Sequence, residues 1–272
     1  MLGEANVSHA SVRYFSVYGE PQTVKEGSHS WVVAWMAMRA KLGLPLHLNG
    51  GGRQVRDSSG LEATGYAKIG EFELSDFLTR WDALHDDALQ VLPERIHPTV
   101  QIHPTAIIGE DVIIGPGVRV HEFSTVRKRS VLGAGPSVGF GCELTHSFVG
   151  ENTVLGHQVG IGHSIIGTGA HLSANLVIAA ISLWNYDLRV PIKEIVLHSP
   201  VDEPPYHCTT SQFGGLIGDK VQTGSMIALG RGIAVGRHSV IAVSVCMGSA
   251  IVPAASVVRS SSPEVVIETR RI

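Results

Sequence analysis

Residues 106–120 read AIIGEDVIIGPGVRV, and this stretch decides the fold. An aliphatic residue returns at every sixth position, as at Ile108 and Ile114, and a small or β-branched residue follows four places later, at Val112 and Val118. A period of six with two inward side chains per repeat is typical of short strands that form the sides of a coil.

The same pattern continues through most of the remaining sequence as aliphatic–glycine pairs. These are Ile108-Gly109, Ile114-Gly115, Leu132-Gly133, Val138-Gly139, Leu155-Gly156, Ile161-Gly162, Ile217-Gly218, Leu229-Gly230 and Val235-Gly236. The repeat predicts a mainly β fold, a left-handed parallel β-helix of about seven coils. We expect the glycine after each aliphatic residue to allow the tight corner between strands, where other residues would be strained.

Two segments stand outside this repeat. Residues 1–95 lack it and predict a small α/β head, whereas residues 96–272 form the β-helix domain. Residues 179–215 interrupt the β-helix with aromatic and charged residues, and we expect them to leave it as a loop insertion that sets the choice of acceptor. Two repeats, Leu144–Phe148 and Ile161–Ile165, are one residue short and should each sharpen a corner.

The head contains one strand-like and two helical segments. Val12–Tyr18 reads as a strand, and Trp31–Met38 as a helix that ends before Gly43. A second helix is predicted over Ser75–Val91, with Ser75 as its N-cap and Leu78, Trp81, Leu84 and Leu89 at helical spacing.

The composition excludes several classes of function. The 272 residues are 44% hydrophobic and 17% charged with a formal charge of −3, which argues against disorder and against binding to nucleic acid or membrane surfaces. Neither a transmembrane run nor a secretory leader is visible, so we expect a cytoplasmic protein. The cysteines Cys142, Cys208 and Cys246 lack metal-ligand spacing.

The repeats resemble the acetyltransferase half of the bifunctional enzymes that make UDP-N-acetylglucosamine, and the related archaeal sugar-1-phosphate nucleotidyltransferase/acetyltransferases. The resemblance rests on Val138-Gly139-Phe140-Gly141-Cys142-Glu143, Leu155-Gly156-His157, Ser164-Ile165-Ile166-Gly167, Leu172-Ser173-Ala174-Asn175-Leu176 and the segment 215–224. It implies a CoA-dependent N-acyltransferase that takes acetyl-CoA and a small-molecule amine, works as a homotrimer, and binds acyl-CoA between neighbouring subunits.

The head resembles a different family, the NAD-dependent nucleotide-sugar epimerases. The matching segments are Arg13–Gly19 and Pro45–Asp57, but no glycine-rich phosphate-binding turn precedes them. We therefore expect no NAD binding. A sugar-nucleotide contact by Arg53 or Arg56 stays open as an alternative.

Acyl transfer to an amine needs a base and an oxyanion donor, and histidine suits the base because its unperturbed pKa of about 6.5 leaves it largely neutral at pH 7. By repeat counting, His157 and Ala174 share one outward position on successive coils, about 4.8 Å apart. The resemblance implies His157 as the catalytic base, Glu143 in the active-site region and Arg127 on the sugar phosphate. It also places Ala174 and Ser225 along the acetyl-CoA site. We therefore assign His157 and Glu143 to catalysis.

Several positions depart from the resembled family. Thr145 and Gly160 stand where that family has a lysine and a tyrosine for the sugar phosphate, and His171 and Ala180 replace two asparagines. We assign Arg127, Thr145, His171 and Asn175 to the acceptor, which should differ from glucosamine-1-phosphate because charge-assisted phosphate contacts are lost.

Two alternatives remain open. The substitutions favour a non-catalytic sugar-nucleotide-binding or scaffold protein, whereas retention of Arg127, Glu143 and His157 opposes it. His146 and His163 also share one outward position on successive coils, as in zinc sites of the γ-carbonic anhydrase type. No third ligand is evident, so we expect no metal.

Overall fold

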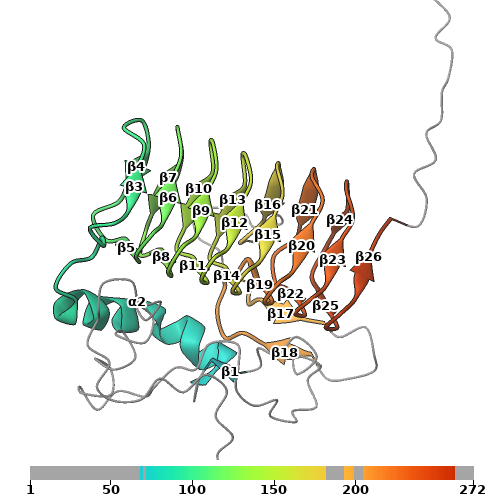
Figure 1. Cartoon of the computed structure of the whole chain (residues 1–272). Coiled ribbons are helices and arrows are strands. Elements are labelled where there is room, and N and C mark those ends of the chain that lie inside the picture. The colour runs from blue at the N-terminus through green and yellow to red at the C-terminus, as the bar shows by residue number, and fades with distance from the viewer. Residues whose placement is uncertain (1–67, 70–71, 182–192, 199–204, 261–272) are drawn as a thin grey trace, which may run out of the picture.

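The structure is a computed structural model that describes residues 68–69, 72–181, 193–198 and 205–260. Three parallel sheets form the sides of a left-handed β-helix, and successive coils stack in register along its axis (Figure 1). The fold class predicted from the hexapeptide repeat is confirmed. The predicted Val12–Tyr18 strand and Trp31–Met38 helix lie outside the described residues, as do all the residues matched to the epimerases.

We call the three sheets face 1, face 2 and face 3, in the order in which each coil visits them. Face 1 contains β3 (Gln101–Ile102), β6 (Arg119–Val120), β9 (Ser137–Val138), β12 (Val154–Leu155), β15 (His171–Leu172), β20 (Gln222–Thr223), β23 (Val240–Ile241) and β26 (Val257–Val258). Face 2 contains β4 (Ile107–Ile108), β7 (Thr125–Arg127), β10 (Glu143–Thr145), β13 (Gly160–Gly162), β16 (Leu176–Ile178), β21 (Ile227–Leu229) and β24 (Cys246–Met247). Face 3 contains β5 (Ile113–Ile114), β8 (Val131–Leu132), β11 (Phe148–Val149), β14 (Ile165–Ile166), β19 (Gly215–Ile217), β22 (Ile233–Val235) and β25 (Ala250–Val252). The corners are named by the faces they join: 1/2, 2/3 and 3/1.

The interior is a column of aliphatic side chains, as the repeat predicts. Val112, Val118, Val159 and Val221 are fully buried in one continuous core. Val100, in the first coil, is only partly buried, since that coil is covered from one side alone.

At several corners the glycine after the aliphatic residue serves a purpose different from the predicted one. Gly139 and Gly156 do not adopt a left-handed backbone; the left-handed residue comes two places later, at Gly141 and Gln158. A Cβ atom on Gly139 would lie 2.0 Å from the carbonyl oxygen of Gly156 in the next coil. Here the glycine is therefore required by the close approach of stacked coils rather than by φ.

Buried serines occupy corner 2/3 in the coils that contain the short repeats. The Ser147 hydroxyl accepts a hydrogen bond from the Ser164 backbone N–H (3.2 Å) and donates one to the Thr145 carbonyl (2.9 Å). Ser130 relates to Ser147 in the same way, and the Ser164 hydroxyl accepts from the Gly215 N–H. Each hydroxyl links one coil to the next at this corner.

Face 3 is covered on its outside. Its outward positions form one apolar ladder through all seven strands: Ile113, Val131, Phe148, Ile165, Leu216, Ala234 and Ile251. The helix α2 (Leu74–Val91) packs against the first strands with Phe77, Trp81 and Leu84, and the antiparallel hairpin of β17 (Val196–Leu197) and β18 (Tyr206–His207) lies beneath the later ones (Figure 1).

Helix α2 begins one residue before the predicted start. Ser75 is inside the helix rather than its cap, and its backbone N–H donates to the Tyr206 hydroxyl (3.1 Å). A short antiparallel pair, β1 (Lys68–Ile69) and β2 (Phe72–Glu73), precedes the helix. Among the described helices, none has the length and apolar character needed to cross a membrane.

Candidate active site

Corner 1/2 brings the predicted base and acyl-CoA residues into one ladder. The Asn175 N–H donates to the His157 carbonyl (2.9 Å), and the Met226 N–H donates to the Ala174 carbonyl (3.0 Å). This register places His157, Ala174 and Ser225 at the same position on three successive coils. The shared outward position expected for His157 and Ala174 is thus present in the structure.

His157 is exposed and held by its backbone. It lies between Gly156 and the left-handed residue Gln158 (φ 55°), so its position at the corner is fixed by the turn. Among the described residues, its imidazole makes no hydrogen bond and no ion pair. The ring is therefore available to a proton donor from solvent or from a bound substrate.

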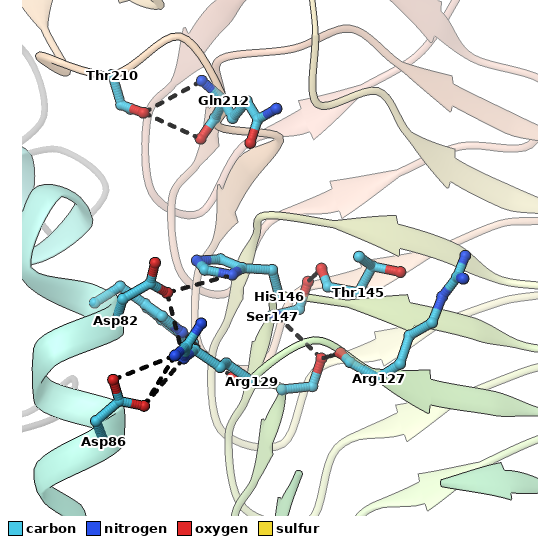
Figure 2. Close-up of polar contacts among 11 residues, drawn as sticks. Asp82, Asp86, Arg127, Arg129, Thr145, His146, Ser147, Thr210 and Gln212 are labelled. Carbon is cyan, nitrogen blue, oxygen red and sulfur yellow. Dashed lines mark hydrogen bonds and ion pairs between the residues drawn. The ribbon is translucent and has the colours of Figure 1, made fainter. Parts of the chain in front are cut away.

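Glu143, one coil before His157, forms an ion pair on face 2 with Arg127, which is one coil further back. Arg127 is in register with Thr145 on the adjacent strand, and its guanidinium donates a hydrogen bond to the Glu143 carboxylate. Both side chains are about half exposed. Glu143 thus orients Arg127, which points away from α2 (Figure 2), and no contact between Glu143 and His157 is present among the described residues.

The other predicted site residues lie on the same two faces. His171 is exposed on face 1, where it is in register with Val154 and Gln222. Asn175 occupies the left-handed position of corner 1/2 (φ 58°) and is exposed. Ser225 hydrogen-bonds through its hydroxyl to that of Ser173 (3.0 Å), next to the half-buried Ala174. None of the eight predicted residues lies on face 3.

An exposed aromatic pair beside His157 was missed at the sequence level. Phe140 precedes His157 by one coil in the corner 1/2 ladder, and its ring meets Phe123 edge to face at 5.7 Å. These side chains are 42% and 63% exposed. The available signal was that these two aromatic residues occupy corner positions at which the next three coils carry small or polar residues, before Met226 and Val243 bring back apolar side chains.

The other exposed large hydrophobic residues gather on the same side. All ten in the described chain lie on face 1, face 2 or corner 1/2: Ile102, Ile107, Phe123, Phe140, Val154, Val177, Met226, Val240, Val243 and Val257. Within the described residues, no exposed large hydrophobic side chain lies on face 3, whose outward apolar ladder is covered, so the apolar surface left open is confined to two faces and the corner between them.

The insertion, residues 179–215, lies away from corner 1/2 in its described part. Its described residues contribute Ile195, Leu197, Cys208 and Phe213 to the cluster that covers face 3. Face 3 is the side of the prism opposite corner 1/2. The expectation that residues 179–215 set acceptor choice therefore finds no support in the described part of the insertion, and residues 182–192 and 199–204 lie outside the described chain.

His146 and His163 form a second cluster, at corner 2/3. Their rings stack at 4.5 Å, as expected for one position on successive coils, and Trp81 covers His146 at 5.3 Å. Burial lowers the pKa of His146, and burial together with His146 lowers the pKa of His163 to about 4. Asp82 of α2 lies 3.9 Å from His146 and also pairs with Arg129 (3.7 Å; Figure 2).

This second cluster fastens α2 to the β-helix. Arg129 makes its closest ion pair with Asp86 (3.0 Å), and its carbonyl accepts a hydrogen bond from the Trp81 indole (3.3 Å). Within the described residues, no group of three or more histidine, cysteine, aspartate or glutamate side chains is arranged to hold a metal ion.

Comparisons with known proteins match the repeats. The family model described as GMPPB C-terminal domain matches residues 91–194. The bifunctional protein GlmU of Methanococcus aeolicus is 27% identical over 146 residues, which cover 54% of this chain and 33% of that protein. GlmU of Methanococcus vannielii is 29% identical over 116 residues, 43% of this chain and 26% of that protein. The matches thus span a third or less of these relatives.

Two solved structures are also similar at low identity. An Arabidopsis UDP-N-acetylglucosamine acyltransferase gives a TM-score of 0.36 at 21% identity, covering 60% of this chain and 61% of that chain. Perosamine N-acetyltransferase from Caulobacter crescentus, with CoA and GDP-perosamine, gives 0.27 at 14% identity, covering 65% and 60%. Over about half of its length, the chain thus resembles the bifunctional protein GlmU, as its sequence motifs predict.

Proposed function

We propose that the protein is an acyl-CoA-dependent N-acyltransferase that transfers an acetyl group to an amino sugar, a sugar nucleotide or another small amine. The observation that supports this most is the corner 1/2 ladder, in which an exposed histidine is followed on the next two coils by Ala174 and Ser225. These three residues match the base and the acyl-CoA positions in the acetyltransferases that the repeats resemble.

His157 is the general base in this proposal. The acceptor nitrogen attacks the thioester carbonyl while the His157 imidazole removes its proton. The tetrahedral intermediate then collapses, the C–S bond breaks, and CoA leaves as the thiol after its sulfur takes the proton back from the His157 imidazolium, which restores the neutral base. Base catalysis of this kind contributes about 10²- to 10⁴-fold in rate.

The acceptor site extends from corner 1/2 onto faces 1 and 2. Arg127, oriented by Glu143, supplies a cation for an anionic acceptor, and Thr145 lies opposite it. His171 and Asn175 border the ladder on the coil after His157. Thr145 and Gly160 carry no charge and add nothing to the cation that Arg127 supplies. We therefore expect a phosphate to be held less strongly here than in a site with two cations.

A neighbouring subunit completes the site. The ladder is exposed and is surrounded by the ten exposed hydrophobic residues, while face 3 is already covered by α2 and the β17–β18 hairpin. A homotrimer that buries faces 1 and 2 would remove this apolar surface from water and enclose acyl-CoA between subunits.

The experiment is a screen of the purified full chain with acetyl-CoA against amino sugars, sugar nucleotides and simple amines. Thiol release is followed together with the mass of the product, and an increase in acceptor mass by one acetyl group is expected. Saturable acetyl-CoA binding without turnover of any acceptor would favour the rival function, a non-catalytic sugar-nucleotide-binding or scaffold protein. Absence of both binding and turnover would overturn the proposal.

A further inference from the structure

Phe140 lies one coil before His157 in the corner 1/2 ladder. The Gln158 N–H donates a hydrogen bond to the Phe140 carbonyl (2.7 Å), which fixes this register. Stacked coils are about 4.8 Å apart. Ala174 and Ser225, the proposed acyl-CoA positions, lie on the two coils after His157. Phe140 is therefore next to the proposed base, on the side away from the acyl donor.

The same side of His157 also carries Phe123 and the ion pair. Phe123 shares a coil with Arg127, and Phe140 shares the next coil with Glu143. The two aromatic rings meet edge to face at 5.7 Å, and the two charged side chains are hydrogen-bonded to each other. The acceptor side of the site thus combines an aromatic pair at corner 1/2 with a charged pair on face 2.

The aromatic pair does not serve the core. Both side chains are exposed, and neither belongs to a hydrophobic cluster of the described residues. Phe123 also adopts a left-handed backbone (φ 57°), which is unfavourable for a bulky side chain. Gly141, Gln158 and Asn175 occupy this position on the next three coils. An aromatic side chain that is both exposed and unfavourably placed favours a binding role over a packing role.

The chemistry of this surface fits a sugar ring. The face of an aromatic ring is apolar and electron-rich, and it packs well against a flat group that presents C–H bonds. A pyranose ring has such faces, whereas its hydroxyl groups project around the rim. Thr145 and Gly160, on neighbouring strands of face 2, carry no charge. Ring packing therefore supplies affinity that charge-assisted contacts from these two positions do not.

We propose that Phe140, supported by Phe123, selects a pyranose amino sugar as the acceptor by packing against one C–H face of its ring. This inference rests on the N-acyltransferase function proposed above. Because Phe140 and His157 are one coil apart, a single six-membered ring can hold its amine at the base while its face covers the phenyl ring. An acyclic amine offers no such face and is bound less tightly.

Glucosamine and its acyclic reduction product, glucosaminitol, are matched probes because they share the same amine and carbon skeleton. Saturation-transfer NMR on the full chain, with CoA present, measures their contact with aromatic side chains. Irradiation of the aromatic protons should label the ring protons of glucosamine and label glucosaminitol much less. Phe140→Leu should lose most of this transfer, whereas Val257→Leu, at an exposed position in β26, should retain it.

Three results would overturn the proposal. The first is a wild-type chain that transfers no saturation to glucosamine, or transfers it equally to both probes. The second is a Phe140→Leu variant that keeps the transfer of the wild type. The third is a Phe140→Leu variant that light scattering shows to dissociate, because Phe140 would then be a contact between subunits.

Binding and turnover are measured separately, which distinguishes this inference from the proposed function. Transfer to glucosamine without turnover of any acceptor would refute the acyltransferase function and still support the aromatic contact. With an amino sugar that is turned over, Phe140→Leu should raise KM about two- to tenfold and change kcat less. A fall in kcat at unchanged KM would contradict a role in acceptor packing.

Discussion

At the scale of single residues, coil stacking depends on glycines that meet the neighbouring backbone. Gly139→Ala would place a Cβ 2.0 Å from the Gly156 carbonyl oxygen, whereas a Cβ on Gly248 meets nothing within 4 Å. We expect Gly139→Ala to destabilise the fold by at least about 2 kcal/mol, because backbone must move to relieve the overlap. Urea unfolding measures the loss, and Gly248→Ala is the control. Equal stability of the two variants would contradict this reading.

The serines of corner 2/3 make a second residue-scale prediction. Ser147 is fully buried, and its hydroxyl is the partner of the Ser164 N–H. Ser147→Ala leaves that N–H unpaired, so the free energy of unfolding should fall by about 1–3 kcal/mol. Ser137 is the matched control. It is half-buried, and its hydroxyl makes a long hydrogen bond of 3.4 Å to the His121 imidazole. Ser137→Ala should therefore change stability by less than about 0.5 kcal/mol.

The period of six was enough to predict which residues share a ladder. Counting repeats placed His157 with Ala174, and His146 with His163, because the coil length is nearly constant. It could not show the ion pair of Arg127 with Glu143, since side-chain reach across coils is not encoded in spacing. Nor could it separate glycines needed for φ from glycines needed for space.

At the scale of elements, the attachment of α2 should depend on pH. The pKa of His85 and of His163 is lowered from 6.5 to about 4, so the unfolded chain binds more protons than the folded chain between these values. Stability should therefore fall as the pH is lowered from 6.5 and level off near 4. The groups facing His163 are His146, Lys128 and Asp82.

Urea midpoints measured from pH 4 to pH 8 test this dependence. The double variant His85→Phe, His163→Asn should show a flatter profile, and asparagine suits the left-handed backbone at position 163 (φ 48°). A double variant whose midpoint falls as steeply as that of the wild type would exclude these histidines as the cause.

The helix itself was predictable, but its partner was not. The spacing of Trp81 and Leu84 indicated an amphipathic helix, and its burial in the structure agrees. The helix packs on face 3 because the outward positions of that face form an apolar ladder. Phe148 and Leu216 belong to this ladder, so the signal is present in the sequence. Those residues read as ordinary repeat positions until the three faces are distinguished.

At the scale of the whole molecule, the exposed apolar residues of faces 1 and 2 predict association. The full chain should scatter light as a trimer at micromolar concentration. Val177→Glu, on face 2, should shift it toward monomer because a buried carboxylate is costly, whereas Lys220→Glu at corner 3/1 should leave the trimer intact. A monomeric wild-type chain would contradict both the trimer and the shared active site.

The sequence predicts the fold more completely than it predicts the association of subunits. The hexapeptide period determines the prism because each repeat buries two inward side chains, such as Val112 and Ile114. Which faces remain open depends on where α2 and the β17–β18 hairpin pack, and the hexapeptide period alone does not show this, because it repeats equally on all three faces.

The most direct test of the account is the turnover of His157→Ala with acetyl-CoA and a confirmed amine acceptor. The side chain is exposed and fills no core, so the thermal midpoint should stay nearly unchanged while kcat falls by at least about a hundredfold. His238→Asn, an exposed histidine at corner 3/1 with φ 59°, is the matched control and should keep wild-type kcat. A His157→Ala variant that retains most of its turnover, or a control that loses as much, would contradict the account.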